Sequence, residues 1–229
     1  TIDNKRYGSS VRCVRDETDT ILVPYSTGWN LVGLPLEVEN ASYTFLFSES
    51  IEGTLYSFNG AYDPATNLIN GEGYWLRFNV AGSTTISGTQ INELTISLNE
   101  GWNLISGINT PFDVIEINDP DEIIISGTIY EFTSGGYSNA EILEPGKGYW
   151  VRCYNEGEII IPEITVTDID GNVYETIAIG EQVWMKENLK VTHYNNGYAI
   201  THITNEEDWG SMDEGQYGVY DDEPTNANI

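Results

Sequence analysis

The chain has 229 residues, of which 36 are acidic and nine basic, and its formal net charge is −27 at pH 7. A field of this sign repels nucleic acid and anionic membrane surfaces, so we expect neither as a partner. No apolar run approaches the roughly 18 residues that a membrane-spanning helix needs, so we expect no membrane insertion.

The first 16 residues carry four of the nine basic residues and form a polar lead followed by one expected strand. No basic-then-apolar secretion signal stands at Thr1, so we expect a processed chain or an internal piece. A single strand is not stable alone, so this segment must pair with another. Its partner can lie in the same chain, or it can complete a neighbouring copy by strand addition. The candidate segment for strand addition consists of Val11, Arg12, Cys13, Val14 and Arg15.

The chain is dominated by an internal repeat with the pattern GWNL followed by GYW[LV]R. The first copy spans 28–31 and 73–77, and the second spans 101–104 and 148–152. A phrase that recurs at a fixed period indicates repeated structural units, and this signal outranks the local propensity of any single segment. We therefore expect one β-repeat over residues 17–90 and a second over residues 91–163.

Each repeat contains two hairpin signals. The apolar runs 21–24 and 29–35 are separated by a short polar turn that ends in Gly28, which predicts a first hairpin in repeat 1. Residues 54–58 lead into Asn59-Gly60 and Tyr62, which predicts a second, because Asn-Gly favours a two-residue turn. The corresponding segments of repeat 2 are 94–98 with 102–107, and 128–132 with Gly135-Gly136 and Tyr137.

Each unit then closes with a glycine-rich turn into the GYW strand and one more Thr- and Ile-rich strand, at 83–87 and 158–161. The number of residues between equivalent positions of the two copies is larger at the end of the repeat (Trp75 to Trp150) than at its start (Gly28 to Gly101). The insertions therefore fall before the central hairpin and in its turn. The unequal stretches 37–52 and 109–126 are therefore the places where we expect any ligand specificity to differ.

Six side chains recur at equivalent positions and are the expected structural anchors of the repeats. The tryptophans can either fill the small cores or stack on the apolar face of a sugar, and their recurrence favours the core. The two arginines are expected to anchor carboxylates or loop carbonyls. The set comprises Trp29, Trp75, Arg77, Trp102, Trp150 and Arg152.

Other candidate sites are weaker. Asp168, Asp170 and Asn172 begin like a calcium loop, but position twelve is Ile179 and the glycine comes early, which favours a plain hairpin turn. Calcium is therefore the one cofactor that the sequence leaves open, and we expect no other. His193 and His202 have no partner at helical metal spacing, and no catalytic grouping is evident, so we expect no enzyme.

The two cysteines, Cys13 and Cys153, both follow an arginine in the phrase Val-Arg-Cys. On an alternating strand each thiol would point away from the preceding arginine, which favours buried free thiols over a disulfide.

After Pro162 the pattern changes to two short strands joined by a glycine turn. The stretch 168–197, DIDGNVYETIAIGEQVWMKENLKVTHYNNG, closely resembles the opening of the Fibrobacter succinogenes major paralogous (FISUMP) domain, and 217–227 resembles its next block. Gly218 stands where that family has a cysteine. Residues 7–16 resemble the last strand of the same domain.

The resemblance implies that residues 7–16 end one such domain and that residues 164–229 begin another. It further implies a C-type-lectin-like fold in which the first and last strands lie side by side, so 172–179 is a candidate partner for the N-terminal strand. Members occur in secreted and surface-exposed bacterial proteins. The repeats likewise resemble β-repeats of secreted bacterial surface proteins.

We therefore predict an all-β protein with two tandem antiparallel β-sandwich or barrel-like repeats and a partial C-type-lectin-like α+β domain. The expected function is a non-enzymatic structural or adhesive module of a secreted or surface-displayed bacterial protein. A further hypothesis is that copies assemble head-to-tail by strand complementation. Its expected partners are neighbouring domains or copies of the same protein. The alternative is a carbohydrate-binding module of a polysaccharide-degrading system, with a glycan as partner.

Overall fold

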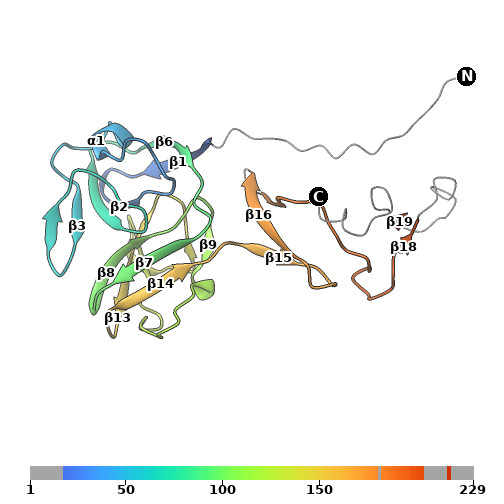
Figure 1. The fold of residues 1–229 in the computed structure, drawn as a ribbon. Coiled ribbons are helices and arrows are strands. Elements are labelled where there is room, and N and C mark those ends of the chain that lie inside the picture. Colours follow the sequence, from blue (N-terminus) through green and yellow to red (C-terminus); the bar gives the residue numbers. More distant parts are fainter. Residues whose placement is uncertain (1–17, 180–181, 204–215, 218–229) are drawn as a thin grey trace, which may run out of the picture. The chain divides into compact units, whose positions relative to one another are not determined.

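A computed structural model describes residues 18–179, 182–203 and 216–217 (Figure 1). The chain divides into two compact units between Pro162 and Glu163, so both repeats belong to one unit. The N-terminal strand expected at 10–15 and most of the block 217–227 lie outside the described residues. In the described ranges, no helix is long and apolar enough to cross a membrane.

The two repeats share six equivalent strands, and repeat 2 has two more, β9 and β12. Repeat 1 consists of β1 (Thr18–Tyr25), β2 (Gly28–Gly33), the short helix α1 (Tyr43–Leu46), β3 (Tyr56–Phe58), β4 (Tyr62–Pro64), β5 (Gly73–Phe78) and β6 (Gly82–Thr89). Repeat 2 consists of β7 (Leu94–Leu98), β8 (Gly101–Ser106), β9 (Phe112–Asp113), a 3₁₀ turn η1 (Val114–Glu116), β10 (Tyr130–Thr133), β11 (Gly136–Asn139), β12 (Ile142–Leu143), β13 (Gly148–Cys153) and β14 (Gly157–Ile161).

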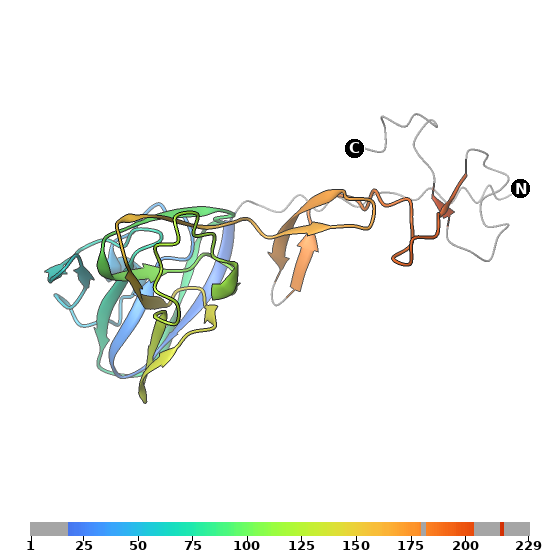
Figure 2. The ribbon, with the colours of Figure 1, turned by 90° about the horizontal axis from the view of Figure 1, so that it is seen from below.

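Each repeat is a small β-sandwich-like unit with two main sheets (Figures 1 and 2), and repeat 2 has a further two-stranded sheet, β9–β12. In repeat 1 the two-stranded sheet β1–β6 accompanies the four-stranded sheet β2–β5–β3–β4, and in repeat 2 β7–β14 accompanies β8–β13–β10–β11. The all-β class predicted from the sequence is confirmed. Within the described residues, the strands of both repeats pair antiparallel, and their sheets do not close into a barrel.

The first predicted hairpin of each repeat is wrong. β1 pairs with β6 along its whole length, and β2 pairs with β5 instead of with β1. In repeat 2, β7 pairs with β14 and β8 with β13. The short turn therefore carries the chain from one sheet to the other.

A fixed corner explains that change of sheet. Gly28 adopts a φ of 92°, which favours glycine, and the Asn30 side chain accepts from the backbone N–H of Ser26 at 2.8 Å. The same asparagine donates to the carbonyl oxygens of Ser26 and Gly28 at 2.8 and 3.0 Å. Asn103 makes the equivalent bonds in repeat 2. The corner is thus held by side-chain bonds that replace the ladder of a hairpin.

The second hairpin of each repeat and the strands that follow it are confirmed. β3 pairs with β4 with Phe58 opposite Tyr62, so this turn has the three residues 59–61 instead of the expected two. β10 pairs with β11 with Thr133 opposite Gly136, so that turn has the two residues 134–135 and Gly136 begins β11. The GYW segments form β5 and β13, and the Thr- and Ile-rich segments form β6 and β14. These predictions rest on turn chemistry and strand alternation, which are local properties of the chain.

The two repeats contact each other reciprocally. The backbone N–H of Gly33 donates to Gly146 O at 3.0 Å, and the N–H of its equivalent, Ser106, donates to Gly71 O at 2.9 Å. Isolated bridges join Val32 to Lys147 and, reciprocally, Ile105 to Glu72. An interface in which residue i meets j′ and j meets i′ is the signature of two-fold symmetry. The repeats therefore form a pseudo-two-fold pair.

The buried side chains belong to two kinds of core. The core of repeat 1 lies between its own two sheets, where Tyr25 stacks on Phe78 with ring centroids 3.8 Å apart, and α1 adds Tyr43 and Leu46. A separate cluster joins the repeats and contains Leu31, Trp75, Leu104 and Trp150. Each four-stranded sheet therefore buries one face inside its own repeat and the other partly against the neighbouring repeat.

The second unit is described in part and by itself. Its strands are β15 (Thr165–Thr167), β16 (Val173–Ile179), β17 (Gln182–Met185), β18 (Thr201–His202) and β19 (Gln216–Tyr217). β16 pairs with both β15 and β17, which confirms the two short strands predicted around the glycine turn. The C-type-lectin-like fold remains a prediction.

Candidate ligand-binding grooves

Two open grooves lie on the first unit, and five aromatic side chains line each of them. The repeat-1 groove has a volume of about 460 Å³ and the repeat-2 groove about 420 Å³. Each lining residue has its repeat equivalent in the other groove. The repeat-1 groove is lined by Trp29, Tyr56, Tyr62, Trp75 and Phe132, and the repeat-2 groove by Trp102, Tyr130, Tyr137, Trp150 and Phe58.

The register of the four-stranded sheet places these rings on one face. In the β2–β5 pair, Trp29 lies opposite Arg77 and Leu31 lies opposite Trp75, while Tyr56 of β3 pairs with Trp75 from the other side. Because side chains alternate along a strand, these residues share the face turned away from the core of repeat 1. The repeated GWNL and GYW phrases therefore build a groove wall.

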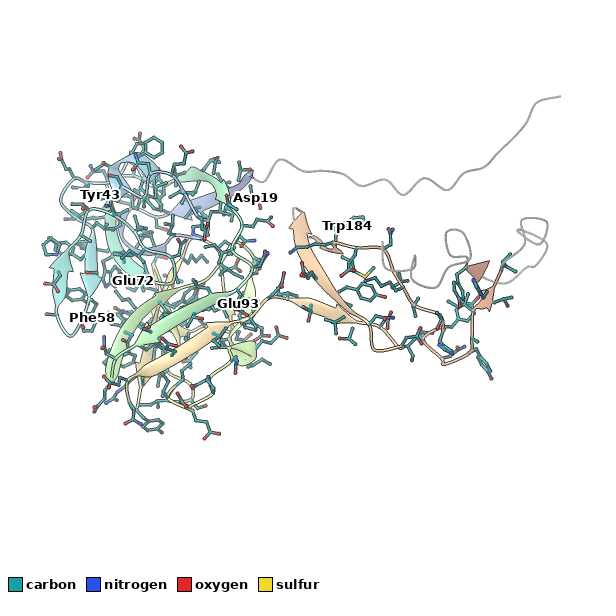
Figure 3. The ribbon with its side chains drawn as sticks, in the orientation of Figure 1. Asp19, Tyr43, Phe58, Glu72, Glu93 and Trp184 are labelled. Atoms are coloured by element: carbon teal, nitrogen blue, oxygen red, sulfur yellow. The ribbon has the colours of Figure 1, made fainter. Side chains whose placement is uncertain are left out.

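Each groove is completed by a ring from the other repeat. The ring of Phe132, on β10 of repeat 2, lies 4.8 Å from Trp75 at an interplanar angle of 74°. Reciprocally, Phe58, on β3 of repeat 1 and labelled in Figure 3, lies 4.8 Å from Trp150 at 77°. The two hairpins thus extend across the interface in opposite directions. Neither groove is complete in a single repeat.

The four repeat tryptophans occupy two different environments. Trp75 and Trp150 are 9% exposed and belong to the cluster between the repeats, whereas Trp29 and Trp102 are 41% exposed. Trp29 meets Trp75 edge-on at 6.2 Å, and Trp102 meets Trp150 at 6.0 Å. The core interpretation therefore describes only the inner pair. The outer pair offers indole surface to solvent in the grooves.

The two recurrent arginines lie over the outer tryptophans. The guanidinium carbon of Arg77 lies 5.9 Å from the ring centre of Trp29, and that of Arg152 lies 5.8 Å from Trp102. Among the described residues the ion pairs involve lysine and histidine, and neither arginine has a carboxylate partner. The expected carboxylate anchoring is therefore replaced by cation–π stacking, which holds the outer indoles in place.

The groove linings carry no ionisable carboxylate or amine, in a chain with 45 charged residues. Each contains two tyrosines, whose hydroxyls are both donors and acceptors of hydrogen bonds. Burial raises the pKa of Tyr137, so its hydroxyl stays protonated at neutral pH. The grooves can therefore offer apolar ring surface and neutral polar groups together.

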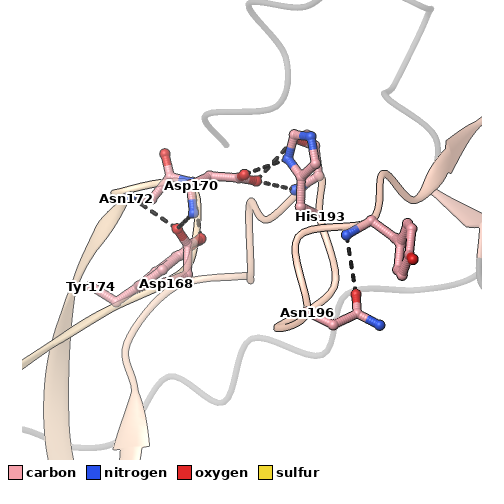
Figure 4. Close-up of polar contacts among 8 residues, drawn as sticks. Asp168, Asp170, Asn172, Tyr174, His193 and Asn196 are labelled. Atoms are coloured by element: carbon pink, nitrogen blue, oxygen red, sulfur yellow. Dashed lines mark hydrogen bonds and ion pairs between the residues drawn. The ribbon is translucent and has the colours of Figure 1, made fainter.

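The candidate calcium residues form a turn held by its own hydrogen bonds (Figure 4). The Asp168 carboxylate accepts from the backbone N–H groups of Asp170 and Asn172 at 2.9 and 3.0 Å, and from Tyr174 Oη at 2.5 Å. The Asp170 carboxylate accepts from the Thr192 hydroxyl at 2.9 Å and lies 2.5 Å from His193 Nδ1. The described residues contain no group of three or more His, Cys, Asp or Glu side chains that could hold a metal ion.

These bonds also set the charge of the turn. Desolvation raises the pKa of Asp168, but the bonds from Tyr174 and Asn172 lower it by more in sum. The bond from the backbone N–H of Thr192 is the main cause that lowers the pKa of Asp170. Both carboxylates are therefore stabilised as anions by donors of the fold itself.

Cys153 is a free thiol, 2% exposed, and it points away from the exposed Arg152 as strand alternation predicts. Burial raises the pKa of this thiol to about 11, so it stays protonated and unreactive at neutral pH. Cys13 and the other residues of the candidate strand-addition segment lie outside the described residues.

The unequal stretches 37–52 and 109–126 do not line either groove. They contribute Phe47 and Phe112 to the buried interior instead. The groove residues that the sequence interpretation missed are those of the central hairpins, such as Tyr56 and Phe58. The signal that could have found them is the Tyr-x-Phe pattern at 56–58 and 130–132, followed in each copy by a further tyrosine.

Comparison of the chain with family models, curated proteins and solved structures gives no match.

Proposed function

We propose that the tandem repeats form a non-enzymatic carbohydrate-binding module, which serves adhesion in a secreted or surface-displayed bacterial protein. The observation that carries this proposal is the pair of matching aromatic grooves, each with an exposed tryptophan held in place by an arginine. Large aromatic residues in an open concave surface are a common way to bind a ligand with an apolar face.

The chemistry of the lining favours a neutral sugar. A pyranose presents C–H groups on one face and hydroxyls at its edge, which suits indole faces beside tyrosine hydroxyls. A polyanion would meet the repulsion of a chain with a formal net charge of −27. Two equivalent grooves also suit a ligand of repeating units, as in a polysaccharide.

The cellular context of the proposal rests on sequence resemblance. The FISUMP-like ends and the surface-protein-like repeats support an exported bacterial protein with several domains, and neighbouring domains or copies would be its other partners. Head-to-tail assembly through residues 11–15 stays a separate prediction, because that segment lies outside the described residues.

The first experiment is a glycan array with the full chain, followed by calorimetric titration with tetrasaccharides of neutral β-1,4-glucan, β-1,4-mannan and β-1,4-xylan. We expect two equivalent sites per chain for the bound sugar. Trp29→Ala should leave only the repeat-2 site, Trp102→Ala only the repeat-1 site, and the double variant neither.

Trp184→Ala is the matched control, because Trp184 is 53% exposed but belongs to the second unit. It should bind as the unchanged protein does. Absence of neutral glycan binding, or full binding by the Trp29→Ala, Trp102→Ala double variant, would reject the proposal. A proline-rich peptide that binds the grooves in place of every sugar would reject it too, because extended proline helices also dock on aromatic grooves.

A further inference from the structure

We infer that the two grooves hold two separate glycan chains related by the pseudo-two-fold of the repeats, so that the tandem repeat cross-links polymer strands. The inference rests on the proposed function and adds the number and orientation of the bound chains. It follows from the pseudo-two-fold symmetry that relates the two grooves to each other.

The grooves are related by the same pseudo-two-fold that relates the repeats. Trp75 meets Phe132 at 4.8 Å and Trp150 meets Phe58 at 4.8 Å, so the contacts are exchanged when the repeats are exchanged. The edge contacts from Gly33 and Ser106 are exchanged in the same way. A simple translation from one repeat to the next would not produce these reciprocal pairs.

A two-fold rotation reverses the line that joins two equivalent points. A polysaccharide chain has a direction, because its reducing and non-reducing ends differ. A straight chain that passed from one groove to the other would keep its direction, whereas equivalent binding in the second groove requires the reversed direction. One continuous straight chain therefore cannot make the same contacts in both grooves.

The short distance between the grooves also disfavours a chain that folds back. Phe58, in the repeat-2 groove, contacts Tyr62, in the repeat-1 groove, with ring centroids 5.3 Å apart. Phe132 and Tyr137 make the equivalent contact at 5.2 Å. A stiff β-linked chain would have to reverse its direction across the width of two rings. Two chains held close together satisfy both grooves without any reversal.

The cross-linking test uses the full chain with the tetrasaccharide that binds tightest and with the long soluble polymer of the same sugar. We expect two tetrasaccharides per chain and, with the polymer, light scattering that rises to several times that of the separate components. Trp29→Ala and Trp102→Ala should each bind one tetrasaccharide and lose the rise in scattering. Trp184→Ala should retain it.

The orientation test uses a hexasaccharide of the same sugar with a spin label at its reducing end. Two chains related by the pseudo-two-fold should broaden the indole N–H signals of Trp29 and Trp102 equally, whereas one spanning chain would broaden only one of them. The inference fails if tetrasaccharide occupies both grooves but the polymer binds as one chain per protein without scattering. It also fails if the single-groove variants still cross-link. Absence of any tetrasaccharide binding would overturn the proposed function itself.

Discussion

Repeat 1 and repeat 2 agree most closely where they face each other and differ most where each packs on itself. Four ring contacts of the grooves have an equivalent in the other repeat that matches to within a few tenths of an ångström, as in the pairs of Trp29 and Trp102 with their inner tryptophans at 6.2 and 6.0 Å. By contrast, the stretch before the central hairpin forms helix α1 in one copy and the β9 strand with a 3₁₀ turn in the other.

This comparison indicates what the duplicated phrases are for. A repeat core can be filled by different segments, provided that the volume is filled with apolar side chains. A reciprocal interface is more demanding, because each residue type must suit its position in both copies. The GWNL and GYW phrases supply that interface and the groove walls. Substitutions at equivalent positions therefore test the comparison directly.

The largest effect is expected for the inner tryptophans. Trp75→Ala and Trp150→Ala should each lower the free energy of unfolding by about 3–5 kcal/mol, because each removes a large buried ring from the cluster between the repeats. Urea unfolding monitored by circular dichroism measures the loss. Trp29→Ala, at an exposed ring, is the comparison variant and should lose clearly less. Equal losses for inner and outer tryptophans would break the distinction drawn between them.

The next effect concerns the close approach of the two backbones. A Cβ at Gly73 would lie 2.6 Å from Ile105 O, and one at Gly148 would lie 2.8 Å from Val32 O. Gly73→Ala and Gly148→Ala should therefore each cost about 1–3 kcal/mol of unfolding free energy, with similar values at the two positions.

The matched control for these glycines is Gly135→Ala, where the nearest atom to a Cβ is Thr133 Oγ1 at an ordinary 3.7 Å. It should change stability little. A large loss at only one of the two interface glycines would contradict the pseudo-two-fold arrangement of the repeats.

A smaller effect separates the two corner asparagines. Asn103 is 7% exposed and Asn30 is only partly buried, although both make the same three hydrogen bonds. Asn103→Ala should cost about 2 kcal/mol and Asn30→Ala about 1 kcal/mol, because water can replace the lost bonds more easily at the more exposed corner. Thermal and urea unfolding measure both. The reverse order would show that burial does not govern the corner.

The smallest effect is a gain. Ser106 is fully buried at the repeat interface, and its Oγ has no hydrogen-bond partner in the structure, whereas the equivalent position of repeat 1 is Gly33. Ser106→Ala should raise the unfolding free energy by up to about 1 kcal/mol, because it removes an unsatisfied hydroxyl. A loss of stability would reveal a partner for this hydroxyl.

The reciprocal change, Gly33→Ser, should instead destabilise the protein, because its Cβ would lie 2.2 Å from Ser106 Cβ. The interface therefore has room for a side chain on one side only. This is the point at which the pseudo-symmetry of the repeats is broken.

The local features of the fold could be predicted from the sequence, and the long-range pairings could not. Asn59-Gly60 fixes its hairpin because that turn needs only neighbouring residues. The pairing of β1 with β6 was missed because two apolar runs around a glycine turn look the same whether they form a hairpin or pass between two sheets. Only the Asn30 bonds to Ser26 and Gly28 distinguish the two.

The grooves were missed for a related reason. The recurrence of the tryptophans predicted that they are structural anchors of the repeats. It did not predict that Trp29 and Trp102 are exposed whereas Trp75 and Trp150 are buried. Phe58 and Phe132 each enter the groove of the other repeat. The sequence pattern does not predict such a contact, because the two hairpins are 74 residues apart in the chain. Symmetry between repeats becomes visible only once both are folded.

The exchange of hairpin rings across the interface is tested most directly by the indole N–H signals in nuclear magnetic resonance spectra of two variants. Phe132→Ala, in repeat 2, should move the signal of Trp75, in repeat 1, more than that of Trp102. Phe58→Ala should move the signal of Trp150 more than that of Trp29. If each substitution instead moved mainly the tryptophans of its own repeat, the grooves would not be shared between the repeats.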